Sequence, residues 1–320
     1  MNPLGVDIAK RNFAVALLRD GKFKNKTFTN TPQGFQALVD WLSKREAGHV
    51  HAGLEATSTY GEALSEWLFA AGHRVSVINP ARIKAFGVSL GTRNKTDPDD
   101  ARVIARFVQA QSPPAWIPLP PEVRQLREMV RRLDAVMGMR EQETNRLETV
   151  VDPMVRRSIP EHITFLETQL KRLRNDIDDH IDRHPDLREQ HALIQSIPGI
   201  GSLTASRMIG LLPPLAGFGS ARQLAAYAGL TPARHESGHS VHGRSALSKR
   251  GPADVRKALY MPALVARNHN PIIHTFCQRL AEAGKTPMQQ IGAAMRKLLH
   301  LIFGVVKSGR PFDPNYLPEG

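Results

Sequence analysis

The stretch LGVDIAKRNFAVALLRDGKFKNKTFT, residues 4–29, contains three strand-like segments separated by two turns. The apolar runs LGVDI and FAVALL are joined by the polar turn AKRN, and Asp20-Gly21 is a hairpin signal in front of FKNKTFT. Because tight turns join antiparallel neighbours, the stretch predicts a three-stranded meander at the start of the fold.

Strand and helix patterns alternate after the meander. Thr31-Pro32 opens a helix with one apolar face, HVHAGLEAT predicts a fourth strand, GEALSEWLFAAG a second helix and HRVSVIN a fifth strand. A meander followed by strand–helix units predicts a mixed sheet with helices on its faces, which is an α/β architecture.

The charge balance of the chain indicates a nucleic-acid partner. Its 320 residues include 43 Lys and Arg against 30 Asp and Glu, a formal net charge of +13. Four Tyr and three Trp are too few for base stacking to be the main binding device. The single cysteine, Cys277, excludes an internal disulfide and a CxxC zinc cluster, which fits a reducing compartment.

No segment predicts insertion into a membrane. The amino terminus MNPLGVDIAKRN lacks the apolar core of a signal peptide, and the apolar segment 291–306 is interrupted by Arg296, Lys297 and His300. That segment therefore predicts a packed amphipathic helix. We expect a cytoplasmic protein of bacterial type that associates with the nucleoid and has no membrane partner.

Three aspartates open a helix in the stretch RNKTDPDDAR, residues 93–102, which VIARFVQAQ continues. Asp97 is expected to be the N-cap and Pro98 the first helical residue, with negative charge where the helix dipole favours it. Helix capping is therefore one explanation of these acids, and metal binding is the other.

The helical period gives the three aspartates different directions. Asp100 lies one turn before the apolar stripe, whereas Asp99 heads a polar row that continues with Arg102 and Arg106. Asp97 and Asp100 are thus expected to converge toward the packed side, with Asp99 facing water. Two carboxylates that point at a protein interior repel each other unless a cation lies between them.

Two further acids stand at strand ends. Asp7 ends the first strand and Glu55 ends the fourth, so their carboxylates meet at one edge if these strands are neighbours. Asp97 and Asp100 can reach the same edge. Four carboxylates match the oxygen preference of Mg²⁺ or Mn²⁺. Two such ions about 3.5 to 4 Å apart can support phosphoryl transfer, so the set predicts a metal-dependent phosphoryl-transfer site.

Two long helical patterns follow a proline-rich break, SPPAWIPLPPE. They predict an antiparallel helical arm, because apolar residues recur at heptad-like spacings of three and four. These residues are Val123, Leu126, Val130, Leu133 and Met137 in the first pattern and Ile163, Leu166, Leu170, Leu173 and Ile177 in the second. The next region contains Pro198-Gly199-Ile200-Gly201, which fits a helix-hairpin-helix turn that holds a phosphate or a plain helix connection.

Several motifs occur in an order that resembles one known family. They are GVDIAK, LEAT followed by Tyr60, VINP, RNKTDPDDAR, SIPGIG, GLTP, ESG, SKRG and FGVVKSGRPFD. The chain resembles, over essentially its whole length, the DEDD transposases of insertion-sequence family 110, which are bridge-RNA-guided recombinases. The resemblance implies a ribonuclease-H-like, RuvC-type domain over residues 1–118, a coiled-coil arm over 119–188 and a mostly helical carboxy-terminal transposase domain over 189–320.

The resemblance also implies site residues. Asp7, Glu55, Asp97 and Asp100 take the four acidic positions, and Ser237 matches the catalytic serine. Spacing alone ranks Ser237 no higher than its neighbours Ser240 and Ser245, and assigns no role to His235, His239 or Arg244. The basic residues expected to contact nucleic acid are Arg93, Lys95, Arg234, Arg244, Lys249 and Arg250.

The expected function is therefore DNA recombination through a serine–DNA ester, with Mg²⁺ or Mn²⁺ as cofactor. The expected partners are donor and target DNA, a guide RNA and further copies of the chain, as a dimer or tetramer. The main alternative is a RuvC-like junction resolvase or nuclease that uses water. A sugar-kinase or actin-like nucleotide fold and a non-catalytic RNA-binding scaffold are further alternatives.

Overall fold

The computed structural model describes residues 1–56, 59–91, 97–233, 236–237, 241–242 and 246–315. At positions 59, 97–98, 236–237, 241–242 and 246 only the backbone is described. The chain forms two units, Met1–Pro118 and Leu119–Gly320. The predicted boundary between an arm and a third domain at residues 188 and 189 stays a prediction.

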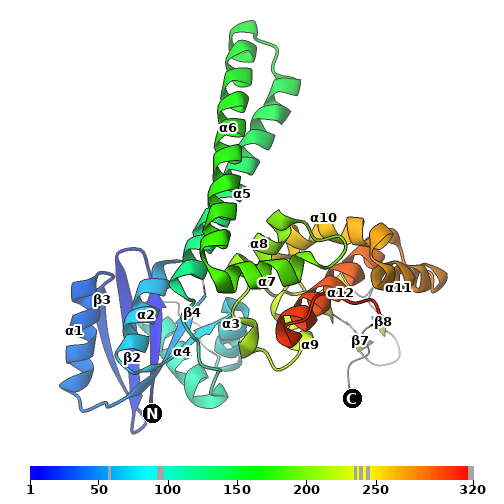
Figure 1. Cartoon of the computed structure of the whole chain (residues 1–320). Helices are drawn as coiled ribbons and strands as arrows, with labels where there is room; N and C mark the ends of the chain where they lie inside the picture. Colours follow the sequence, from blue (N-terminus) through cyan, green and yellow to red (C-terminus); the bar gives the residue numbers. More distant parts are fainter. Residues whose placement is uncertain (57–58, 92–96, 234–235, 238–240, 243–245, 316–320) are drawn as a thin grey trace. The chain divides into compact units, whose positions relative to one another are not determined.

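A five-stranded mixed sheet organises the first unit (Figure 1). Its order is β3-β2-β1-β4-β5, with the first three strands antiparallel and β1, β4 and β5 parallel. The strands are β1 (Asn2–Ile8), β2 (Asn12–Arg19), β3 (Lys22–Thr29), β4 (Val50–Glu55) and β5 (Arg74–Ile78). The predicted meander and mixed sheet are confirmed, and the first and fourth strands are neighbours. This arrangement is consistent with a ribonuclease-H-like domain.

Helices cover both faces of this sheet, because alternate side chains of its central strands are buried on opposite sides. The four main helices are α1 (Pro32–Ser43), α2 (Glu62–Ala70), α3 (Pro80–Ser89) and α4 (Asp97–Gln111). One face packs Leu4, Val6 and Leu54 against α1 and α2. The other face packs Ile78 of β5 against α3 and α4.

Helix α3 is an element that the sequence patterns did not predict. Its start is set by Asn79, whose side-chain oxygen accepts a hydrogen bond from the Ala81 amide at 2.8 Å, and by Pro80 in the first turn. Only Ile83 and Gly87 are buried in it, so its apolar face is too narrow to give a clear helical period.

The second unit begins with two long helices, α5 (Pro121–Thr149) and α6 (Pro153–Arg183), which pack side by side as an antiparallel hairpin (Figure 1). The residues buried in their contact include Leu126, Val130, Leu133, Leu166, Leu170 and Ile177. One continuous core joins this pair to the later helices. The coiled-coil character expected of the pair remains a prediction.

The later helices complete the second unit. They are α7 (Pro185–Gln195), α8 (Ser202–Leu211), α9 (Ala221–Tyr227), α10 (Ala253–His269), α11 (Pro271–Glu282) and α12 (Pro287–Ser308). Helix α12 is the amphipathic helix predicted over 291–306, and its buried row includes Leu298, Leu299 and Ile302. Within the described part of the chain, no helix is long and apolar enough to cross a membrane.

Candidate active site

Two glycines let helix α4 lie directly on strands β1 and β4. A Cβ atom added to Gly5 would lie 1.9 Å from the Ala101 carbonyl oxygen, and one added to Gly53 would lie 2.4 Å from a methyl group of Val108. No side chain fits in such a gap, so both positions require glycine. Gly5 and Gly53 stand opposite each other in the parallel register, and both face α4.

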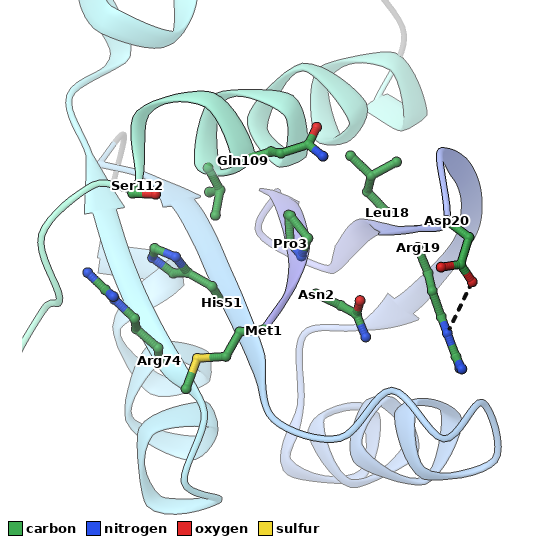
Figure 2. Close-up of a pocket in the computed structure, with 11 residues that line it drawn as sticks. Met1, Asn2, Pro3, Leu18, Arg19, Asp20, His51, Arg74, Gln109 and Ser112 are labelled. Carbon is green, nitrogen blue, oxygen red and sulfur yellow. Dashed lines mark ion pairs between the residues drawn. The ribbon is translucent and has the colours of Figure 1, made fainter.

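Helix α4 runs antiparallel to these two strands. The last turn of α4 and the residue after it contribute Gln109 and Ser112 to a pocket that also includes Asn2, Pro3 and His51, from the beginnings of β1 and β4 (Figure 2). The carboxy-terminal end of α4 therefore lies at the start of the strands. Its first turn consequently lies at the opposite edge, where β1 and β4 end.

The four predicted acidic positions share that second edge, called the acid edge below. Asp7 and Glu55 follow Gly5 and Gly53 by two residues, so the period of a strand directs their side chains to the same face as α4. Asp7, Glu55 and Asp100 are all half-buried. Asp97 begins α4, one residue before the predicted start at Pro98, and its side chain lies outside the described residues.

The donor set at the acid edge fits a hard divalent cation. Carboxylate oxygens are the ligands that Mg²⁺ and Mn²⁺ prefer, and these four positions offer carboxylates alone. Among the side chains that the structure describes, no three His, Cys, Asp or Glu are gathered closely enough to hold a metal ion. The Asp97 side chain is not among those side chains. The acid edge is therefore defined here by the backbone positions of the four acids.

Asp99 lies apart from this set. It forms an ion pair with Arg102 at 3.2 Å, and its side chain is 35% exposed. The carboxylate therefore contacts the next member of the polar row while it stays partly exposed to water. Its role as a helix-capping residue without a metal stays a prediction.

Ser237 lies in a short strand. Strand β7 (Glu236–Ser237) pairs antiparallel with β8 (Val241–His242), and Ser237 stands opposite Val241. A second ladder joins β6 (Pro232–Ala233) to β9 (Ala246–Leu247). The sequence does not indicate these ladders, because ladder hydrogen bonds join backbone groups and a segment poor in apolar residues gives no alternating pattern.

Several predicted residues around the serine and the aspartates fall outside the described residues. These are Arg93, Lys95, Arg234, His235, His239, Ser240, Arg244 and Ser245. Lys249 and Arg250 are described and exposed just after β9. Their backbone packs closely on the turn before β6, since a Cβ atom at Gly229 would lie 2.9 Å from the Arg250 amide nitrogen.

The turn Pro198–Gly201 connects α7 to α8. Gly199 has a φ of 99°, and an added Cβ atom would lie 2.7 Å from the Ala266 side chain. Both the backbone conformation and the lack of space therefore require glycine here. Gly201 precedes α8 and provides no side-chain cap. This geometry suits a tight helix connection and a phosphate-binding turn equally well.

The pattern Gly-x-acid was the signal that sequence reasoning missed. It occurs as Gly5-Val6-Asp7 and again as Gly53-Leu54-Glu55, on two neighbouring strands in the same register. In each case the glycine admits the helix, and the acid stands two residues further along the strand, on the same face of the sheet. Gly5 and Gly53 are thus positioning residues for the acid edge.

The opposite edge carries a polar network beneath the pocket of Figure 2. The His51 Nε2 atom lies 2.8 Å from the Ser76 hydroxyl, which donates to the Pro114 carbonyl at 2.7 Å. Burial, and then the charges of Arg74 and the N-terminal amine, lower the pKa of His51 to about 4. The imidazole is therefore neutral near pH 7.

Known proteins match both units of the chain. A family model described as Transposase matches residues 4–155, and one described as Transposase IS116/IS110/IS902 family matches residues 191–278. The chain is 34% identical over 313 residues to the pilin gene-inverting proteins of Moraxella bovis and Moraxella lacunata. The alignment covers 97% of this chain and 97% of each of those proteins. It is 28% identical over 163 residues to the insertion element IS110 uncharacterized 43.6 kDa protein of Streptomyces coelicolor, covering 51% of this chain and 39% of that protein. Because relatives align over nearly its whole length, the chain belongs to the IS110 family of DEDD transposases, enzymes that cut and rejoin DNA.

Proposed function

We propose that this protein recombines DNA by phosphoryl transfer at the acid edge, with Ser237 as nucleophile and a guide RNA selecting the sites. The observation that carries the proposal is the antiparallel packing of α4 on β1 and β4. This packing brings the backbone positions of four acids from three separate segments to one edge. The full-length likeness to proteins named for gene inversion supports recombination between two DNA sites.

The serine step conserves atoms and charge. The Ser237 hydroxyl oxygen attacks a backbone phosphorus, a serine–phosphate ester forms, and the departing strand end leaves as a hydroxyl with the serine proton. A hydroxyl of another strand then displaces the serine and returns the proton to it. Rejoining therefore needs no external energy source.

The acids act by holding charge near the phosphate. Asp7, Glu55, Asp97 and Asp100 would hold Mg²⁺ or Mn²⁺, which, when bound, neutralises charge on the phosphate under attack. The half-burial of Asp7, Glu55 and Asp100 limits competition from water for these carboxylates.

The acids are tested by replacing each with its amide. Asp7→Asn, Glu55→Gln, Asp97→Asn and Asp100→Asn should each abolish recombination and leave nucleic-acid binding largely intact, because no positive charge is removed. Asp99→Asn is the matched control, since it changes the same helix turn and loses one ion pair, at a cost of a few tenths to about 1 kcal/mol. Equal loss of recombination at Asp99 and Asp97 contradicts the assignment.

The nucleophile is tested by trapping the covalent product. Wild-type protein incubated with Mg²⁺ and substrate DNA should yield a protein–DNA adduct that survives denaturation, and Ser237→Ala should yield none. Cleavage without an adduct in the wild type would instead support the water-using nuclease. The guide is tested by sequencing RNA that co-purifies with the protein, where absence of a defined RNA argues against guidance.

A further inference from the structure

Two arginines of α4 share one aromatic ring of β3. The guanidinium carbons of Arg102 and Arg106 lie 5.8 and 5.6 Å from the centroid of the Phe23 ring. A cation over a ring face is attracted by its quadrupole, so Phe23 keeps two like charges near each other on the sheet surface. Neither the acid edge nor Ser237 explains this arrangement.

The two arginines differ in how their charges are satisfied. Arg102 pairs with Asp99 at 3.2 Å, and Asn25, with its amide oxygen facing Arg102, accepts from Nε at 3.0 Å and from a terminal nitrogen at 2.6 Å. Arg106 is exposed and makes no ion pair with any carboxylate that the structure describes. Arg102 is therefore held in place, and Arg106 is available to an anion from outside.

The strand that carries Phe23 also bears three lysines, which alternate with Phe23 and Asn25 and therefore point to the other face of the sheet. Lys22, Lys24 and Lys26 are exposed on β3, which is the edge strand of the sheet. Lysines on an edge strand also prevent pairing with another sheet, which is sufficient reason for those three. That reason does not extend to Arg102 and Arg106, because both belong to a helix.

The direction of this polar row along α4 indicates which ligand it would bind. Asp99, Arg102 and Arg106 follow one another along α4, starting at the turn that carries Asp100 and moving away from the acid edge. Arg102 and Arg106 are four residues apart, or about 6 Å along the helix axis. Successive cations at that interval can each meet a phosphate of one nucleic-acid strand.

We propose that Arg102 and Arg106, supported by Phe23 and Asn25, bind the phosphate backbone of the DNA strand that leaves the acid edge, with Arg106 as the direct contact. This inference rests on the proposed function, since it takes the acid edge as the place where DNA is cut. Such contacts fix the position of the DNA and carry no base specificity.

The test compares arginines that are stacked on different rings of the same unit. Arg106→Gln removes the proposed contact, and Arg45→Gln is the control, because Arg45 lies 4.1 Å from the Trp41 centroid on the helix of the opposite face. Affinity of the full-length protein for a fluorescent DNA duplex is measured across salt concentrations. Arg106→Gln should lower the log–log salt slope by about 0.9, whereas Arg45→Gln and Arg106→Lys should keep the wild-type slope.

The same titration with a structured RNA separates the ligands. An unchanged DNA slope for Arg106→Gln overturns the inference, and so does a change that appears only with RNA. If the salt slope of the wild-type protein were zero for both DNA and RNA, the proposed function itself would be contradicted. Thermal melting of each variant identifies loss of fold, and Arg106→Lys keeps the charge should Arg106→Gln fail to fold.

Discussion

At the scale of single residues, His51 shows how burial sets protonation in this protein. Its imidazole is 7% exposed and lies near Arg74, so the neutral form is favoured and its pKa falls to about 4. Burial, and then the neighbouring His49, also lower the pKa of His73. Both side chains belong to the first unit.

We predict that the first unit loses stability as pH falls below about 6.5. Between the unfolded pKa of 6.5 and the folded value of about 4, the unfolded chain binds a proton that His51 in the folded protein does not, so the free energy of unfolding drops. The loss from His51 saturates near pH 4, on the order of 3 kcal/mol. All three tryptophans, Trp41, Trp67 and Trp116, lie in this unit, so denaturant titrations followed by tryptophan fluorescence measure it.

His51→Gln is the comparison for that measurement. The variant lacks the titrating imidazole, so its stability should change less between pH 7 and pH 4.5 than that of the wild type. Equal pH dependence in the two proteins would show that His51 is not responsible.

At the scale of elements, the contact between α4 and the sheet controls the acid edge. We predict that Gly5→Ala lowers the stability of the first unit by about 1 to 3 kcal/mol, because its Cβ would meet the backbone of α4 at Ala101 and Ala105. It should also reduce DNA cleavage, since α4 carries Asp97 and Asp100. Fluorescence-detected unfolding and a cleavage assay measure the two effects.

Gly138→Ala is the matched control for that substitution. Gly138 lies inside α5 with open space around its Cβ position, so alanine should stabilise that helix by about 0.5 to 1 kcal/mol and leave cleavage unchanged. If Gly5→Ala behaves like Gly138→Ala, the close approach of α4 does not position the acids.

Most strands and helices of the first unit could be predicted from the sequence, but the way they pack together could not. Strands such as FAVALL have clear periods and turns, and Asp7 and Glu55 could be placed at strand ends from these alone. The direction of α4 across the sheet depends on Gly5 and Gly53, whose absent side chains give no hydrophobic signal. Likewise, the pairing of Ser237 with Val241 rests on backbone hydrogen bonds, which leave no mark on the order of apolar residues.

At the scale of the whole molecule, the predicted nucleophile and the four predicted acids belong to different units. Ser237 stands 237 − 97 = 140 residues beyond Asp97, and it belongs to the second unit whereas the four acids belong to the first. The helices α5 and α6 lie between them in the chain. Chain connectivity therefore does not require Ser237 to act with the acids of its own copy.

We predict that Ser237 of one copy acts with the acids of another. Ser237→Ala and Asp97→Asn proteins, each inactive alone, should recover partial cleavage and adduct formation when mixed, because one pairing unites an intact serine with intact acids. Mass measurement of the mixture confirms that mixed oligomers form. An inactive mixture that contains mixed oligomers would show that the site is built within one chain.

The division of the acids between a sheet and a helix also affects how the enzyme tolerates heat. Among the residues that the structure describes, seventeen buried apolar residues form the core on the α1 and α2 face of the sheet, whereas the core beneath α3 and α4 has six, together with small alanines such as Ala14, Ala16, Ala101 and Ala105. The thinner layer opens at a lower free energy, so the amides of α4 should exchange with deuterated solvent before those of β1 and β4. Such an opening separates Asp97 and Asp100 from Asp7 and Glu55 while the sheet stays intact. Heat inactivation should therefore be reversible over a range of temperatures below that at which the tryptophans become exposed.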